Sequence, residues 1–581
     1  MSKQLPSSPD DPGLHQRVRK FERHVVEEIE LTDTAAVEAV RRRERRVQWR
    51  LVAAWFGLAV VLVGAGLYAR GVWPSDETRL LGIAWEMWAR GNLLVPYLND
   101  QPQLHAPLFF WLIHLGWSVA GVSEWWPRLV PALGALASLA LLPQIARRLW
   151  PEERELARYA PLLLLGTFAF TLSAVVALPD AWLGCTVLLA YWGLVLQWRV
   201  RDHRAWLLTA LGLGLATLVS GPIAWVYVLP VALLAPLWAH APRPQWRHWY
   251  ADVGKASALA FVVFAAWLVA AGSSEGWSYV ARYLTHAWKG VPLELFAGPD
   301  PWWWYAWLVP LAFLPWSVLP LAWMRLWHVR REPLDGGFLL CLAWGVVPLA
   351  LLWLLPLKQP QYLLPLLPAG ALLASRLLLT RAWRDVFQEQ SFAGMAFPLM
   401  ALGGVLMVLP RLPRVEWLPG LLWELSPFIG VAIIGVGIAT AWVPIKDVGR
   451  RVFDLAALCV LLVVCALLGV ASQLDSLFPL TAVGSALARA QAEGRPLAHV
   501  GEYRGEFHFA GQLRAPLAQI EPARVEAWAA AHPNGAIVTY AERWRPRVLV
   551  RSATLLETPF RDEQLRVLDA QQVLSVPAKS E

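Results

Sequence analysis

Long apolar runs separated by short polar segments make up most of the chain after residue 50. Runs of about 18 or more residues with few charges are typical of helices that cross a lipid bilayer. The run at 107–121 is shorter, and it is predicted to be an interfacial helix within one large outer loop, residues 71–127. The other runs predict thirteen spans: 51–69, 128–146, 159–176, 181–198, 205–219, 222–239, 256–273, 302–324, 337–356, 361–379, 393–410, 420–443 and 453–472.

The segments at the two ends of the chain are polar. Residues 1–50 alternate acidic and basic patches and are predicted to be a cytoplasmic segment close to the membrane surface. Because this polar segment precedes the first apolar run, that run is expected to be an uncleaved anchor rather than a signal peptide. Residues 476–581 are predicted to form a small soluble α/β domain, with strands at 497–500 and 536–540 and a helix at 522–531.

The positions of Lys and Arg predict the orientation of the spans, because cytoplasmic loops are enriched in both residues. With residues 1–50 in the cytoplasm, an odd number of spans places residues 476–581 on the outer, periplasmic side. The formal net charge of +8 is accounted for by basic loops and does not indicate a nucleic-acid partner. Six loops are basic, at residues 147–158, 199–204, 243–255, 325–331, 376–384 and 446–451.

Composition supports the membrane interpretation. The chain is 57% hydrophobic and 16% charged, whereas soluble domains are roughly 25% charged. Many of its 36 Trp residues lie at the ends of apolar runs, as in the aromatic belts of membrane proteins. The expected fold is an all-α polytopic membrane domain, residues 51–472, followed by the α/β domain. All four cysteines lie inside apolar runs and are expected to be buried residues rather than disulfide or zinc ligands: Cys185, Cys341, Cys459 and Cys465.

Isolated charges at the outer ends of the predicted spans are the candidates for chemistry, because charges at membrane depth are costly. Asp76 and Glu77 follow the first span, Asp180 is isolated between two apolar runs, and Lys358 precedes another run. Simpler structural roles stay open at this stage. Ser75, Asp76 and Glu77 can start a helix, Asp180 can cap one, and Lys358 can extend to the membrane interface. The segment 273–301 adds Arg282, His286 and Lys289 as further cations.

Several short segments, in order, carry a family resemblance. The first outer loop has Asp76, Glu77 and Arg79 in sequence, a Leu-Pro-Asp-Ala segment contains Asp180, and a Lys-x-Pro-x-Tyr-Leu-Leu-Pro segment contains Lys358 and Tyr362. Together with the segments at 91–93, 96–99 and 301–305, this order resembles the bacterial aminoarabinose-transferase-like branch of the GT-C glycosyltransferases, which is related to the protein O-mannosyltransferases. The resemblance covers residues 50–380, and residues 476–581 match in layout only.

The resemblance implies a multi-pass glycosyltransferase of the bacterial inner membrane. Its donor would be a polyprenyl-phosphate-linked sugar, and its acceptor a lipid or glycan hydroxyl on lipid A, another envelope glycolipid, a polysaccharide or a protein. Inversion at the anomeric carbon is implied as well. The resemblance and the isolated charges suggest Asp76, Glu77 and Asp180 as catalytic residues. The candidates for substrate binding are Arg79, His105, Arg282, His286, Lys289, Lys358 and Tyr362.

The chain departs from the family pattern at two places. Leu104 and His105 stand where the family has Glu and Lys, and Ser220 stands where it has a second Lys. The resemblance therefore leaves a divalent metal undecided, because Leu104 occupies one expected ligand position. Two other classes stay open: a lipid or sugar transporter or flippase, and a non-catalytic GT-C relative. Transporters typically place polar groups near the membrane midplane in interrupted helices, whereas the candidate charges here gather at one face.

Overall fold

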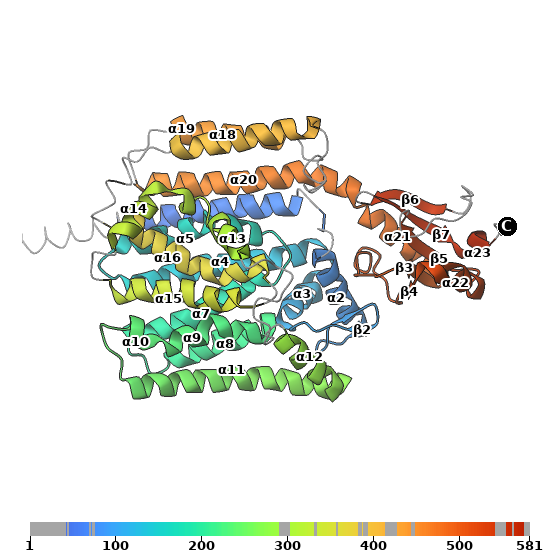
Figure 1. The fold of residues 1–581 in the computed structure, drawn as a ribbon. Helices are drawn as coiled ribbons and strands as arrows, with labels where there is room; N and C mark the ends of the chain where they lie inside the picture. Colours follow the sequence, from blue (N-terminus) through green and yellow to red (C-terminus); the bar gives the residue numbers. More distant parts are fainter. Residues whose placement is uncertain are drawn as a thin grey trace, which may run out of the picture. The chain divides into compact units, whose positions relative to one another are not determined.

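The computed structural model describes residues 42, 46–68, 71–72, 76–289, 303–329, 334–355, 358–380, 386, 393–412, 427–442, 448–540, 554–560 and 563–574. The chain divides into two compact units, Met1–Phe56 and Gly57–Glu581. In the first unit, the described residues are helical. The fold discussed below is that of the second unit, a helical bundle followed by a small α/β domain (Figure 1).

Eight helical segments among the described residues are long and apolar enough to cross a membrane, so the chain is a multi-pass membrane protein. They cover nine of the thirteen predicted spans: seven segments match one span each, and Ala205–Leu233 matches two. That last segment contains α8 (Ala205–Ser220), the short η1 (Gly221–Ile223) and α9 (Ala224–Leu233). Gly221 ends α8 with a φ of +74°, a conformation that glycine adopts without steric cost.

The bundle is built from helices of unequal length (Figure 1). The long ones are α4 (Trp125–Leu149), α7 (Asp180–Arg199), α11 (Trp246–Glu275), α15 (Gly336–Trp353), α16 (Leu367–Leu378) with the preceding η3 (Pro360–Leu366), and α20 (Val448–Leu477). Shorter apolar helices are α10 (Ala235–Trp238), α18 (Ala393–Val408) and α19 (Pro427–Trp442). The strongest helix contacts are α18 with α19, α7 with α8 and α4 with α7.

Two predicted spans are divided rather than continuous. The run 159–176 forms α5 (Arg154–Leu165) and α6 (Phe168–Ser173), separated at Thr167, whose backbone is extended. The run 302–324 forms α13 (Trp304–Ala312), η2 (Trp316–Val318) and the start of α14 (Pro320–Val329). Leu319 is extended because a following proline disfavours the helical conformation. The two interruptions pack together, since Phe168 N donates to Leu314 O at 2.9 Å.

Contacts between helix termini define one end of the bundle. Arg199, the last residue of α7, donates to the carbonyl of Leu149 at the end of α4. Asp335, which caps the start of α15, accepts hydrogen bonds from Trp150 at 2.9 Å and from Arg376 at 3.0 Å. The ends of α4, α7 and α16 therefore meet the start of α15. Two of the basic segments noted in the sequence converge at this end.

The segment between the first span and α4 forms a compact subdomain. It contains α2 (Asp76–Arg90), a two-stranded hairpin of β1 (Tyr97–Leu98) and β2 (Gln101–Pro102), and α3 (Leu108–Ala120). At 13 residues, α3 is too short to cross a hydrocarbon core about 30 Å thick. It packs against α2 and α4, and buried side chains of α2 and α3 share one apolar cluster.

The α/β domain contains a mixed five-stranded sheet in the order β4-β3-β5-β7-β6. Strands β4, β3 and β5 are parallel, whereas β5, β7 and β6 are antiparallel. The predicted strands at 497–500 and 536–540 are β3 (Leu497–Val500) and β5 (Ala536–Tyr540), and the predicted helix comprises η6 (Pro522–Arg524) and α22 (Val525–Ala531). The other elements are α21 (Leu480–Ala492), β4 (Ala518–Ile520), β6 (Thr554–Phe560), β7 (Glu563–Asp569) and α23 (Ala570–Leu574).

Candidate functional site

Asp76 and Asp180 come from distant parts of the chain and lie close together in space. Asp76 is the exposed first residue of α2, and Asp180 is the first residue of α7, with only 8% of its surface exposed. The negative charge of Asp76 is near enough to act on Asp180, and Asp180 is near enough to act on Tyr362 in η3. Three candidates from three segments therefore meet at the end of α7 opposite Arg199.

The helix-cap interpretation of Asp180 does not match the local geometry. The N-cap residue of α7 is Pro179, and no side chain caps this helix. Asp180 follows the cap position and is enclosed by protein. A carboxylate in such a place costs free energy unless neighbours stabilise it. For Asp76, the proposed cap residue Ser75 lies outside the described residues.

Lys358 precedes η3 and is 3% exposed. A lysine that extends toward the membrane interface keeps its ammonium group in water, whereas this side chain is enclosed by the protein. Its neighbour Tyr362 belongs to the Asp76 and Asp180 cluster. The segment 358–362 therefore brings the Tyr362 phenol to Asp180 and also contains a buried cation, Lys358.

Two tyrosines that the sequence did not single out hold this segment. The Tyr227 hydroxyl donates to the Tyr362 carbonyl at 2.9 Å, and the Tyr305 hydroxyl donates to the Gln359 carbonyl at 3.3 Å. Both tyrosines are fully buried. Tyrosines within apolar runs are common, so no signal in the sequence marked Tyr227. Tyr305 does lie in the aromatic segment 301–305 that contributed to the resemblance.

Glu77 points away from the solvent and has a structural partner. It is 2% exposed, and its Oε1 accepts a hydrogen bond from Ala177 N at 2.5 Å. Ala177 lies in the turn that precedes Asp180. A charge-assisted bond of this kind is stronger than a neutral one. Glu77 therefore ties the start of α2 to the turn that presents Asp180.

Arg79 connects the helix that carries Asp76 to Gln103, which follows the β1–β2 hairpin. It lies three residues after Asp76 in α2, so both side chains share one helix face. Its guanidinium donates to Gln103 Oε1 at 3.3 Å, and the Tyr279 hydroxyl donates to the Gln103 carbonyl at 3.1 Å. Arg282 in α12 (Trp277–Lys289) is exposed, and its charge acts on Tyr279. Arg79 and Arg282 thus approach the same hairpin segment.

Three candidate cations remain, His105, His286 and Lys289. His105 is half-buried, and its ring contacts the Phe110 ring at a centroid distance of 6.3 Å. His286 and Lys289 lie in α12, but their side chains are outside the described residues.

A divalent metal does not fit the residues that the structure describes. Among them, no group of three His, Cys, Asp or Glu side chains could hold a metal ion. Leu104, at the expected ligand position, packs against the apolar cluster that contains Val95, Tyr97 and Phe264. A leucine offers no lone pair, so one expected metal ligand is missing from this chain.

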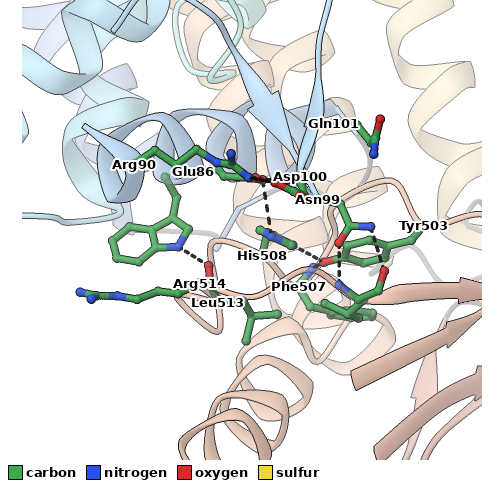
Figure 2. Close-up of polar contacts among 12 residues, drawn as sticks. Glu86, Arg90, Asn99, Asp100, Gln101, Tyr503, Phe507, His508, Leu513 and Arg514 are labelled. Carbon is green, nitrogen blue, oxygen red and sulfur yellow. Dashed lines mark hydrogen bonds and ion pairs between the residues drawn. The ribbon is translucent and has the colours of Figure 1, made fainter. Parts of the chain in front are cut away.

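The C-terminal α/β domain is docked onto the first-loop subdomain (Figure 2). The Trp85 indole donates to the Leu513 carbonyl at 2.8 Å. The Asn99 amide makes two bonds to the Leu517 backbone, donating to its carbonyl at 2.9 Å and accepting from its N–H at 2.7 Å. All of these groups are buried or partly buried. The loop that carries Asp76 is therefore attached to the domain that follows the last helix.

Beside these bonds lies an acidic and basic network in which Glu86 and His508 are buried and Arg90 and Asp100 are exposed (Figure 2). Glu86 pairs with Arg90 at 2.6 Å, and Arg90 also pairs with Asp100. His508 from the α/β domain faces Glu86 at 3.6 Å and bonds to the Tyr503 hydroxyl at 3.1 Å. Burial, together with the positive charge of Arg90, lowers the pKa of His508 to about 4. The sequence analysis missed this network, although Glu86 and Arg90 are spaced as a helical ion pair.

The fold defines the class of protein. Crystal structures of ArnT from Cupriavidus metallidurans, in the apo state and bound to undecaprenyl phosphate, superpose with a TM-score of 0.72 at 19% sequence identity. The match covers 90% of this chain and 99% of that protein. The chain therefore has the helical membrane fold of ArnT, including its C-terminal domain.

Sequence comparisons show what the chain is similar to. Residues 104–269 match the family model of dolichyl-phosphate-mannose-protein mannosyltransferases. The undecaprenyl phosphate-alpha-4-amino-4-deoxy-L-arabinose arabinosyl transferase of Pseudomonas paraeruginosa is 30% identical over 64% of this chain and 66% of its own length. The enzyme of the same name from Pseudomonas aeruginosa is 30% identical over 58% of this chain and 60% of its own length. The matched segment thus spans less than two thirds of these relatives. Over the matched region, the chain is similar in sequence to these aminoarabinose transferases.

Proposed function

We propose that the protein is a glycosyltransferase that moves a sugar from a polyprenyl-phosphate carrier to an acceptor hydroxyl at the outer face of the bacterial inner membrane. The observation that carries this proposal is that Asp76, Asp180 and Tyr362 lie close together, with the buried Lys358 on the same segment as Tyr362. Carboxylates can accept the proton of a hydroxyl, and a buried cation can stabilise a phosphate. The names of the relatives support this class of reaction.

The donor to test first is undecaprenyl phosphate-alpha-4-amino-4-deoxy-L-arabinose, which appears in the relatives' name. A structural neighbour was crystallised with undecaprenyl phosphate, the lipid half of such a donor. The acceptor would be a hydroxyl of lipid A, another envelope glycolipid, a polysaccharide or a protein. The relatives' transferase names do not favour the transporter alternative.

The proposed reaction is a displacement with inversion at the anomeric carbon. The acceptor oxygen forms a bond to that carbon while the bond to the phosphate oxygen breaks, and the phosphate leaves with the electron pair. Asp76 orients the acceptor hydroxyl and accepts its proton, because its carboxylate is exposed at the start of α2. Asp180 is enclosed behind it and supports its placement. No step passes through a metal.

Other groups would act on the departing phosphate or on the geometry of the site. Lys358 stabilises the charge that develops on the phosphate, with Tyr362 beside it. Arg79, His105 and Arg282 are further candidates for contacts with the donor or acceptor, and so are His286 and Lys289. Glu77 acts through its bond to Ala177, which positions the turn before Asp180, so we assign it a positioning role.

We also propose that the membrane domain has thirteen spans in total. The eight long helical segments support most of them. The divided helices α5–α6 and α13–α14, with α18 and α19, would supply the rest. This count keeps α3 outside the hydrocarbon core and places the α/β domain in the periplasm.

The substitution Asp76→Asn tests the mechanism. Asn starts helices about as well as Asp, so a purely structural role predicts normal folding and normal activity. If Asp76 accepts the proton, the transfer rate should fall roughly 10²–10⁴-fold while the protein still inserts and purifies normally. The measurement is sugar transfer from the lipid-linked donor by purified protein in liposomes, normalised to folded protein.

Two further variants complete this test. Asp180→Asn should cause a smaller loss than Asp76→Asn, because Asp180 supports the placement of Asp76 and does not accept the proton. Glu124→Gln, which changes another exposed carboxylate of the first loop, should leave the rate unchanged. Wild-type transfer by Asp76→Asn would contradict the mechanism and favour a non-catalytic relative.

A further inference from the structure

A second site lies away from the carboxylate cluster, between the β1–β2 hairpin and the α/β domain. A cavity of about 490 Å³ is lined on the hairpin side by Asp100 and Gln101 and on the domain side by Gln519, Trp528 and His532. A cavity of this size is within the range of small-molecule sites. None of these residues belongs to the proposed catalytic site.

Three of the lining residues, Asn99, Leu517 and Arg495, hold the walls of the cavity in place. The two bonds between Asn99 and the Leu517 backbone join the hairpin to the domain. On the domain side, Arg495 pairs with Asp569 at 3.0 Å and donates to the Asn534 carbonyl at 2.8 Å. The cavity is therefore formed in the absence of a ligand, which lowers the cost of binding.

An aromatic surface forms one wall. The His532 ring stacks on the Trp528 ring at a centroid distance of 4.6 Å and an interplanar angle of 23°. Gly535 makes room for this indole, because a Cβ at that position would lie 2.6 Å from the Trp528 ring. Both rings are half-buried. The wall is therefore flat, apolar and partly open to a ligand.

Three polar side chains that line the cavity, Gln101, Gln519 and Asp100, have unused hydrogen-bonding capacity. Gln101 is exposed, and Figure 2 shows its side-chain amide apart from the network around Asn99. Gln519 uses its Oε1 to accept from Tyr503 N at 3.3 Å, which leaves its NH₂ group as a donor. Asp100 pairs with Arg90 but is 57% exposed, so its carboxylate can accept further bonds.

We propose that this cavity binds one pyranose unit of a glycan. The C–H face of a sugar ring is apolar and packs on an aromatic side chain, while its hydroxyls pair with amide and carboxylate groups. A phosphate fits poorly, since the exposed carboxylate of Asp100 would repel it and Arg495 is already paired. The chemistry of the wall and of the polar groups therefore selects a neutral, hydroxyl-rich ring.

The position of the cavity suggests which glycan it holds. Arg90, which pairs with Asp100, ends the helix that begins at Asp76, and a helix of this length spans about 21 Å. If the proposed function holds, the bound ring belongs to the acceptor, in a part of it that does not react. Binding energy from such a remote part can align the reacting hydroxyl.

Binding can be measured without turnover. Full-length protein in detergent micelles is mixed with trisaccharides of glucose, galactose, mannose or N-acetylglucosamine, and saturation-transfer NMR reports which protons contact the protein. We expect at least one of these sugars to bind to the wild-type protein. Trp528→Ala should weaken binding about 10-fold or more, and Gln101→Ala about 3- to 10-fold.

The variants separate this site from the catalytic one. Glu526→Ala, an exposed change on the same helix as Trp528, should bind as the wild type does. Asp76→Asn should also bind normally, whatever its effect on transfer. Because Gln101 is exposed and lies on a different segment, its variant stays informative if Trp528→Ala does not fold. Absence of binding by all four sugars, or equal binding by wild type, Trp528→Ala and Gln101→Ala, would overturn the proposal.

Discussion

Lys358 and Asp180 are ionisable residues that the fold encloses, at 3% and 8% exposure. Removing a charge from water costs several kcal/mol unless other groups compensate. The sequence indicated that both residues were isolated among apolar neighbours, which made them candidates. It could not show that Asp180 lies near Tyr362, four residues after Lys358, because Asp180 begins α7 and Tyr362 belongs to η3, far away in the chain.

Replacement of Lys358 by Ala tests its role toward the donor. The loss of one charge-assisted contact to phosphate should cost roughly 1.5–3 kcal/mol. We expect weaker use of the lipid-phosphate donor and little change in the concentration dependence on the acceptor. The measurement is the transfer rate as a function of each substrate in turn.

Two comparisons support the interpretation of Lys358. Lys358→Arg keeps the positive charge and should retain part of the donor use. Lys255→Ala removes a lysine that is 57% exposed and paired with Asp252, and it should have no effect. An unchanged dependence on donor in Lys358→Ala, with only the acceptor dependence altered, would count against a phosphate contact.

The helix α2 links the candidate catalytic site to the α/β domain. Asp76 is at its start, Glu77 anchors the turn before Asp180, and Trp85 and Glu86 face the domain. The residues Ser75, Asp76 and Glu77 indicated that a helix could begin near Asp76. It did not indicate which residues face the later domain, because that domain follows some 400 residues later in the chain.

Docking of the domain onto α2 should depend on pH through His508. Its pKa is lowered to about 4, whereas an exposed histidine titrates near 6.5. Between these pH values the undocked state therefore binds more protons than the docked state. The contribution of His508 to the free energy of docking is fully present above pH 6.5 and is lost as the pH falls toward 4. Between pH 7 and pH 5 the loss should be about 2 kcal/mol.

Hydrogen exchange of the segment around Tyr503 and Leu513 measures this docking. Above pH 5 most exposed carboxylates remain ionised, so His508 dominates in that window. His508→Gln keeps a polar side chain that does not titrate, and it should make the protection independent of pH from 7 to 5 after correction for intrinsic exchange. An equal loss of protection in this variant and in the wild type would assign the effect to another group, such as Glu86.

At the scale of the molecule, the charged groups separate between the two ends of the bundle. Arg199 and Arg376 meet helix termini at one end. Asp76 and Asp180 meet at the other, and α2 there contacts the α/β domain. This separation supports a cytoplasmic end and an outer end, as the positive-inside rule predicts.

Thiol labelling tests the proposed topology. The native cysteines provide little background, since Cys185, Cys341 and Cys459 are buried and Cys465 is partly buried. Arg524→Cys introduces an exposed thiol in the α/β domain. In intact spheroplasts it should react with a membrane-impermeant reagent, because thirteen spans place this domain outside.

The control is Arg201→Cys, an exposed position in the loop after α7. It should react only after the membrane is disrupted. Protection of the thiol at position 524 in intact spheroplasts would contradict the count of thirteen. It would also mean that α3 or another short apolar helix has been assigned wrongly as crossing or not crossing the membrane.

The sequence by itself determined the features that depend on local composition. Apolar runs of sufficient length become helices because their backbone groups must be paired within the membrane, and eight long segments confirm the multi-pass class. The predicted strands β3 and β5 are present as well. Short motifs in a fixed order were sufficient to indicate the family, because such motifs survive where overall identity is low.

The tertiary structure decided how these elements are interrupted and which side chains meet. Leu319 and Thr167 divide two predicted spans where interrupted helices pack together. Glu77 binds a backbone N–H a hundred residues away, and Asn99 binds the backbone of Leu517. Hydrophobic periodicity indicates which face of a helix or strand is buried, but not which other element that face packs against. Contacts between distant segments depend on the packing of the whole chain, so only the folded structure shows them.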